Sequence, residues 1–388
     1  MNTSYNKRQV NTSQRERGTR MEKFDLEHYL TISIEHMIKN ILKTSIKNPA
    51  ASMFFMQYAK HMTRAQKIRS DEEKKGNHIP AFLIGSITTQ CNLHCKGCYA
   101  RANHSCFDGT REGMPSVLPG EKWKEIFDEA AELGIGFVIL IGGEPFVRKD
   151  VLQKAGEQKK ILFPIFTNGT MMDAEYLEIL KKNRNLLPVL SIEGEKETTD
   201  ERRGRGVYQK LNETMQSLKK EGIFYGASIT VHKGNLEEVL SDRFIDTLAE
   251  ASCRAVFYVE YVPTTKESRG IVLGDSERER LMGRLRELRS KQQDMMFIAF
   301  PGDEESSGGC LAAGRGFFHI NAYGGVEPCP FSPYSDTNLS NLTLLEALHS
   351  PLFVKLNENG NLFKEHIGGC VLYEQEEQVK ALLKEETV

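Results

Sequence analysis

Three cysteines in one short segment constrain this chain more than any other feature. Cys91, Cys95 and Cys98 follow a C-x3-C-x2-C spacing. An apolar, strand-like run that ends in Gly85 and Ser86 precedes them, so we expect the cysteines in the loop after a first strand. Several thiolates in one loop favour a soft metal, and iron–sulfur clusters are held in this way. Three ligands on a four-iron cluster leave one iron open, as three protein ligands do in a catalytic zinc site.

Two other interpretations of these cysteines compete with a cluster. Positions 91, 95 and 98 would share one face of a helix, where they would be ordinary small core residues. Gly97 and the polar composition of the segment argue against such a helix. A structural zinc site needs a fourth ligand, and His94 lies inside the first gap, where its geometry is poor. We therefore prefer an iron–sulfur site.

Composition limits the class of protein. The chain has 388 residues, enough for one large domain with additions, and its net charge of −2 gives no sign of nucleic-acid binding. Eight cysteines in a chain of this length do not suggest a secreted disulfide scaffold. The first twenty residues contain no apolar signal region, and no run approaches the ~20 apolar residues of a membrane span. We expect a cytoplasmic protein.

The N-terminal region differs from the rest in charge. Residues 1–80 carry fifteen Lys or Arg and eight Asp or Glu, an excess of seven positive charges. We expect a disordered tail over 1–20 and two helices, from Phe24 to about 47 and over about 50–69. Their apolar residues, edged by lysines and arginines, can lie on an anionic membrane or cover an amphipathic substrate. We expect instead that the apolar stripe docks onto its own domain.

From residue 79 onward, apolar strand-like runs alternate with helical patterns, which predicts a parallel sheet. We expect helices over 121–133, 173–182, 208–221, 236–251 and 277–289. Six strands are expected, over 81–88, 136–142, 161–167, 187–193, 224–231 and 254–262. Six strand–helix units fall short of the eight of a closed barrel, so the predicted fold is α/β, a partial (β/α)6 TIM-like barrel with its site at the carboxyl ends of the strands.

The predicted strand ends carry the candidate site residues. Gly142 and Gly143 end the second strand and would let a ligand approach the backbone, while Glu144 offers an acceptor for an ammonium group. Ser191 and Glu193 end the fourth strand and point to the same face, because side chains alternate along a strand.

The last predicted strand and the C-terminal region contain further candidates. Glu260 and Tyr261 end the sixth strand as weak catalytic candidates, of which alternation sends one outward. Beyond a glycine-rich loop near residue 301, Cys310 and Cys329 flank a predicted hairpin that turns at Gly324, and Cys370 follows. Cys253, at the start of an apolar strand, is expected to be an ordinary buried cysteine.

These motifs together resemble the radical S-adenosylmethionine (SAM) superfamily. The resemblance covers about residues 80–375 and includes the C-x3-C-x2-C loop followed by Tyr99. It implies a 4Fe-4S cluster on the three cysteines, which cleaves SAM reductively to a 5′-deoxyadenosyl radical. It also implies a set of SAM-binding residues: Tyr99, Gly142, Gly143, Glu144, Ser191 and Glu193. Arg202 and Arg203 would grip the SAM carboxylate or, as the alternative, form a solvated charge cluster.

The C-terminal cysteines are similar to the auxiliary-cluster extension called SPASM, in its shorter Twitch form. The similarity implies that Cys310, Cys329 and Cys370 hold a second 4Fe-4S cluster, with zinc as the alternative. Cys106, His366, a backbone group, water or substrate would complete the ligand set. The expected divisions are a tail (1–20), a helical extension (21–78), the barrel (79–300) and the auxiliary region (301–388).

The sequence does not identify the substrate. The resemblance implies maturation of a peptide or protein, or modification of a small metabolite or cofactor precursor, with a flavodoxin- or ferredoxin-type electron donor. The basic N-terminal helices suggest a lipid-like or amphipathic substrate as an alternative, with peripheral membrane contact less favoured. An electron carrier or a structural zinc protein is the non-enzymatic alternative. We expect no nucleic-acid partner.

Overall fold

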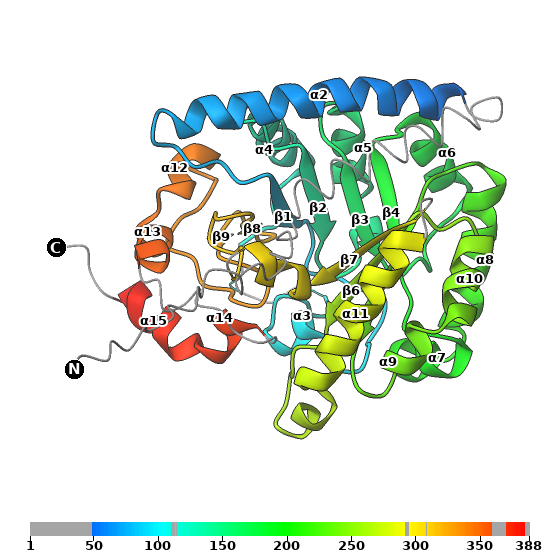
Figure 1. Ribbon diagram of the computed structural model, residues 1–388. Coiled ribbons are helices and arrows are strands. Elements are labelled where there is room, and N and C mark those ends of the chain that lie inside the picture. The colour runs from blue at the N-terminus through cyan, green and yellow to red at the C-terminus, as the bar shows by residue number, and fades with distance from the viewer. Residues whose placement is uncertain are drawn as a thin grey trace, which may run out of the picture.

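A computed structural model describes residues 49–109, 113, 115–291, 295–307, 309–358 and 370–384. The predicted tail and the first predicted helix lie outside these residues. The core of the molecule is a curled parallel sheet with helices on its outer face (Figure 1). None of the helices in the described ranges combines the length and the apolar character needed to cross a bilayer.

The sheet contains all six predicted strands in parallel pairing. Their bounds are β1 (Phe82–Ser86), β2 (Phe137–Ile141), β3 (Phe163–Thr167), β4 (Leu186–Ser191), β5 (Gly226–Val231) and β6 (Ala255–Glu260). The sheet order is β7-β6-β5-β4-β3-β2-β1-β8-β9. This arrangement confirms the predicted partial barrel.

A seventh parallel strand, β7 (Met296–Phe300), extends the barrel beyond the prediction. Its sequence, Met-Phe-Ile-Ala-Phe, is apolar throughout, as expected for a strand that is covered on both faces. It gives no alternating pattern, and it was missed because the predicted helix before it led directly into a glycine-rich loop.

The predicted helices lie where the apolar periodicity placed them, with one exception, and α3, α5 and α7 are present in addition. Their bounds are α3 (Tyr99–Ala102), α4 (Gly120–Glu132), α5 (Lys149–Glu157), α6 (Ala174–Lys182), α7 (Lys196–Arg203), α8 (Val207–Lys220), α9 (Leu236–Val239), α10 (Asp242–Glu250) and α11 (Asp275–Lys291). The single helix predicted over 236–251 is two helices. The break occurs because the Ser241 hydroxyl accepts a hydrogen bond from the Phe244 amide at 3.2 Å and so caps α10. Short 3-10 turns complete the layer: η1 (Pro145–Val147), η2 (Glu267–Ile271) and η3 (Gly302–Ser307).

The helix α2 (Pro49–Glu73) closes the amino-terminal end of the barrel. The Tyr58 hydroxyl donates to the carbonyl of Gly136, just before β2, at 2.9 Å. The ring of Phe55 lies edge-on to Phe224, just before β5, with centroids 5.4 Å apart. Phe55 and Tyr58 of α2 therefore dock onto the domain, as expected for the second helix, whereas Met53 and Met56 are exposed. The cysteine loop leaves the opposite end of the sheet.

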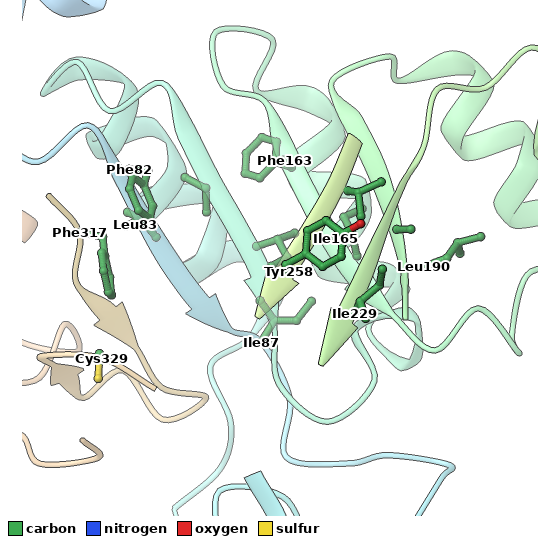
Figure 2. Close-up of a cluster of buried hydrophobic side chains, with 14 of the residues drawn as sticks. Phe82, Leu83, Ile87, Phe163, Ile165, Leu190, Ile229, Tyr258, Phe317 and Cys329 are labelled. Atoms are coloured by element: carbon green, nitrogen blue, oxygen red, sulfur yellow. The ribbon is translucent and has the colours of Figure 1, made fainter. Parts of the chain in front are cut away.

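The C-terminal hairpin belongs to the same sheet. Strand β8 (His319–Ile320) pairs in parallel with β1, and β9 (Val326–Glu327) pairs with β8 in antiparallel register. Phe82 of β1 stacks on Phe317 with centroids 5.2 Å apart, and Cys329 lies on the same C-terminal segment (Figure 2). The predicted boundary near residue 300 is therefore not a boundary of the sheet. Helices α12 (Leu344–Leu348), α13 (Pro351–Glu358), α14 (Val371–Glu374) and α15 (Glu376–Lys384) follow.

Candidate cluster and cofactor site

The cysteine loop runs from the end of β1 to α3, at the carboxyl end of the barrel. Cys91, Cys95 and Cys98 are half-buried, and the segment 91–97 is not helical, which removes the shared helix face as an explanation. Cys98 precedes α3 and its amide donates to the carbonyl of Cys95 at 3.3 Å. His94 Nε2 lies 2.9 Å from an exposed carboxylate oxygen of Asp108, so its ring is engaged at the surface.

The two glycines after β2 pack against the backbone that leads into this loop. The Gly143 amide donates to the Thr88 carbonyl at 3.0 Å, and the Glu144 amide donates to the Gln90 carbonyl at 2.7 Å. A Cβ on Gly143 would collide with the Gln90 carbonyl, and a Cβ on Gly142 would lie 2.5 Å from the Thr88 carbonyl oxygen. The close approach that these glycines permit is thus to the chain's own cysteine loop.

The carboxylate of Glu144 joins two strand ends. It is buried and accepts hydrogen bonds from the Thr167 hydroxyl at 2.7 Å, the Asn168 amide at 2.8 Å and the Phe146 amide at 3.0 Å. Burial raises the pKa of Glu144 to about 7, although these hydrogen bonds oppose the shift. Glu144 therefore ties the ends of β2 and β3 together, and its predicted contact with an ammonium group stays a prediction.

An ion-pair network links the end of β4 to the cysteine loop. Glu193 is completely buried, and its Oε1 accepts hydrogen bonds from Arg202 at 2.7 Å and from Arg203 Nε at 2.8 Å. Its Oε2 accepts from the Thr230 amide at 3.0 Å. Arg203 Nη1 also lies 4.0 Å from the Cys95 sulfur. The two arginines, predicted to grip a cofactor carboxylate, bind a carboxylate of their own chain in this structure.

The remaining candidates at the strand ends divide between the two faces of the sheet. Ser191 ends β4 opposite Ser228 of β5 and is partly exposed. Glu260 pairs with Arg278 of the outer helix α11 at 2.9 Å. Tyr261 is buried, and its hydroxyl lies so close to Gly97 that a side chain there would collide with it. Of the two weak catalytic candidates, Tyr261 is therefore the one that contacts the cysteine loop.

The structure brings the three C-terminal cysteines together. Cys329 and Cys370 are hydrogen-bonded through their side chains, which together with burial raises the pKa of the Cys329 thiol. Cys310 is buried, and its pKa is raised by burial, by Glu304 and by Cys370. Among the described residues, no three His, Cys, Asp or Glu side chains converge on one point as the ligands of a single ion do. A cluster carries its thiolates on different irons and tolerates a wider spacing.

The other cysteines are accounted for differently. Cys106 hydrogen-bonds to Cys91, which lowers the pKa of Cys91 to about 6, so Cys106 lies beside the first cysteine set. His366 lies outside the described residues. Cys253 is buried, and its thiol donates to the Ala255 carbonyl at 3.2 Å, as expected of an ordinary core cysteine.

Tyr99 joins the two cysteine sets. Its ring packs against Phe331 with centroids 4.7 Å apart, and Asn103 donates to the Pro330 carbonyl at 3.1 Å. Burial raises the pKa of Tyr99, and the thiols of Cys98 and Cys329 raise it further. The predicted cofactor-binding tyrosine thus lies between the two sites.

Sequence reasoning missed a buried hydrogen-bond chain nearby. His319 Nε2 lies 2.8 Å from the Ser86 hydroxyl, and His319 Nδ1 lies 2.7 Å from Oε2 of Glu327. His319 and Glu327 are directly opposite each other in the hairpin register. The register is symmetric about Tyr323, so counting outward from the predicted turn at Gly324 would not have found this pair.

Three comparisons place the chain among known proteins. Residues 86–245 match the radical SAM superfamily. The chain is 30% identical over 179 residues to the Fe-coproporphyrin III synthase of Methanosarcina barkeri, a match that covers 44% of this chain and 43% of that protein. It is 25% identical over 329 residues to the AdoMet-dependent heme synthase of the same organism, covering 76% of this chain and 91% of that protein.

A solved protein–peptide complex has a similar fold. The crystal structure of Streptococcus suis SuiB bound to precursor peptide SuiA superposes with a TM-score of 0.62 at 19% identity, covering 83% of this chain and 80% of SuiB. This likeness extends well beyond the matched domain, although at such low identity it speaks for the fold alone. Residues 86–245 are thus a radical SAM domain.

Proposed function

We propose that this enzyme binds a 4Fe-4S cluster through Cys91, Cys95 and Cys98 and uses it to cleave SAM. The observation that carries the proposal is the loop itself. Its three thiols are half-buried at the carboxyl end of the barrel, and backbone hydrogen bonds from Gly143 and Glu144 hold the segment before them. When bound, the cluster supplies the electron that converts SAM into methionine and a 5′-deoxyadenosyl radical, which abstracts hydrogen from the substrate.

The surrounding side chains fit this group. A reduced cluster with three thiolates is anionic, and Arg203 lies near Cys95 while also pairing with Glu193. Tyr261 supports the loop from β6. We assign Ser191, on the exposed end of β4, to a polar contact with SAM. The segment Gly142–Glu144 positions the loop and offers backbone groups to the cofactor. The polar side of the cofactor site is closed by Glu193, Arg202 and Arg203.

We also propose that Cys310, Cys329 and Cys370 hold an auxiliary cluster. Cys310 and Cys329 are buried, and Cys329 is hydrogen-bonded to Cys370. Bound iron would displace the thiol protons and share the negative charge of the thiolates. Contact between Tyr99 and Phe331 joins the segments that carry the two clusters.

For the substrate we favour a tetrapyrrole, a small cofactor precursor. The match with a heme synthase covers 91% of that relative, and the first relative is named for Fe-coproporphyrin III. A precursor peptide is the second candidate, because SuiB, which shares the fold, was crystallised with one. Binding of Fe-coproporphyrin III, followed by its Soret absorbance, would support the first candidate. Absence of a spectral shift would favour the peptide. We propose a flavodoxin or ferredoxin as the electron donor in either case.

The test of the central proposal is SAM cleavage by protein reconstituted with iron and sulfide under anaerobic conditions. With dithionite, the enzyme should release 5′-deoxyadenosine, and the Cys91/Cys95/Cys98→Ala triple variant should release none. Cys253→Ala is the matched control, because it removes a buried thiol outside both cysteine sets. Equal product from the triple variant and the parent would refute the assignment.

A further inference from the structure

A buried carboxyl group lies beside Cys310. Glu304, in η3 after β7, is only 6% exposed. Its carboxyl group hydrogen-bonds with the Cys310 thiol, and its Oε2 accepts a long hydrogen bond of 3.4 Å from the Leu311 amide. The Gly309 amide donates to the Glu304 carbonyl at 3.3 Å, so the chain folds back and Glu304 meets Cys310.

Asp303, the residue before Glu304, shows how this region compensates a buried carboxylate. Asp303 is buried too, but its Oδ2 receives Arg289 at 2.6 Å and the Ala299 amide at 2.8 Å. Glu304 has a weaker environment. Its neighbours are the Cys310 thiol and the Leu311 amide at 3.4 Å, while the Arg315 guanidinium acts at longer range. A buried carboxylate is costly unless a cation or strong hydrogen bonds offset the loss of water. Direct binding of a Glu304 oxygen to an iron of a cluster held by Cys310 would offset that cost.

One named candidate for the fourth ligand, Cys106, lies elsewhere. Cys106 contacts Cys91 in the first cysteine set. Cys310 and Cys329 both interact electrostatically with Cys370, so these three thiols form one group, and Glu304 is a carboxyl group that contacts it. Iron binds carboxylate oxygen as well as thiolate sulfur.

We propose that Glu304 is the fourth protein ligand of the auxiliary cluster, bound through a carboxylate oxygen to the iron that the three cysteines leave uncovered. The proposal rests on the proposed function, namely that Cys310, Cys329 and Cys370 bind a cluster. On loading, the Cys310 thiol loses its proton to solvent and its sulfur binds iron. This breaks the hydrogen bond to Glu304, whose oxygen then binds the fourth iron, and any proton on the carboxyl group also leaves to solvent.

The test uses the Cys91/Cys95/Cys98→Ala variant of the full chain, in which only the auxiliary cluster remains. After reconstitution and reduction, its electron paramagnetic resonance (EPR) spectrum should not change when imidazole is added, because Glu304 covers the fourth iron. Glu304→Ala should open that iron, so imidazole should shift the spectrum. The open cluster should also release iron to a chelator about tenfold faster. Glu304→Cys should restore slow release with a different EPR spectrum, since a thiolate replaces the carboxylate.

Glu129→Ala is the matched control. Glu129 is a partly buried carboxylate that accepts a backbone hydrogen bond, from the Leu344 amide at 2.7 Å, and it should leave both readouts unchanged. If imidazole shifts the spectrum with Glu304 intact, or if Glu304→Ala changes neither readout, Glu304 is not a ligand and the cluster itself stands. If the triple variant binds no iron while remaining folded by circular dichroism, the auxiliary cluster is refuted and the ligand with it.

Discussion

Gly143 offers the sharpest test of how the barrel holds its cysteine loop. In Gly143→Ala, the added Cβ would collide with the Gln90 carbonyl and would lie 3.0 Å from the Cys91 amide nitrogen. These are backbone atoms, so no side-chain rotation relieves the collision. The loop must move away from β2, and the hydrogen bonds from the Gly143 and Glu144 amides must lengthen or break.

The magnitude follows from these contacts. Two backbone hydrogen bonds contribute about 1–3 kcal/mol together, and overpacking adds about 1 kcal/mol or more. We expect Gly143→Ala to lower the free energy of unfolding of the apo-protein by about 2–4 kcal/mol, measured by urea titration. We also expect it to lose the iron of the first cluster, about four atoms per chain, while the auxiliary iron stays.

The control is Gly270→Ala, since nothing lies within 4 Å of a Cβ at that position. It should change stability by less than about 0.5 kcal/mol and leave iron content unaltered. A Gly143→Ala protein with the stability and iron content of the parent would show that the loop does not depend on its packing against β2.

Three further predictions test the helix α2 and two buried groups. Phe55→Ala should destabilise the protein by about 3 kcal/mol or more, whereas Met53→Ala, at a residue 55% exposed, should cost less than about 0.5 kcal/mol; equal values would show that α2 does not dock as described. The folded pKa of Glu144, about 7, exceeds its ordinary 4.5, so this group lowers stability as pH rises from 4.5 to 7, by at most about 3 kcal/mol. Glu144→Gln should flatten that part of the stability–pH profile, and an unaltered slope would contradict the assignment. Cys106→Ala should raise the pKa of Cys91 in the apo-protein, which slows its alkylation by iodoacetamide at pH 7, as followed by mass spectrometry; an unchanged rate would mean that Cys106 does not activate Cys91.

The partial barrel was predictable because its strands and helices differ in apolar period. The strand β6 illustrates the limit of that information. Alternation required Glu260 and Tyr261 to face opposite sides of the sheet. Which of them faces outward is decided by the helix layer, where Arg278 of α11 forms an ion pair with Glu260. The strand β7 has no alternation to detect, because both of its faces are covered.

The position of the site was predictable, but the ion pairs between its charged side chains were not. Spacing placed Cys91, Cys95 and Cys98 in one loop, and the structure agrees. No local pattern shows that Glu193 receives Arg202 and Arg203, because these partners meet only when α7 folds back over the end of β4. Charged side chains with two possible partners, cofactor and protein, cannot be assigned from sequence alone.

The pairing of β8 with β1 has a consequence for the order in which the chain folds. The strand that leads into the cysteine loop has β2 on one side and the C-terminal hairpin on the other, and Ser86 and His319 are 233 positions apart. During synthesis, one edge of β1 therefore stays open until β8 (His319–Ile320) has been made. Open edges attract other strands, and contacts so distant in sequence form slowly. A chain that stops after β7 would leave this edge exposed, so the radical SAM barrel depends on the C-terminal hairpin to cover the open edge of its first strand.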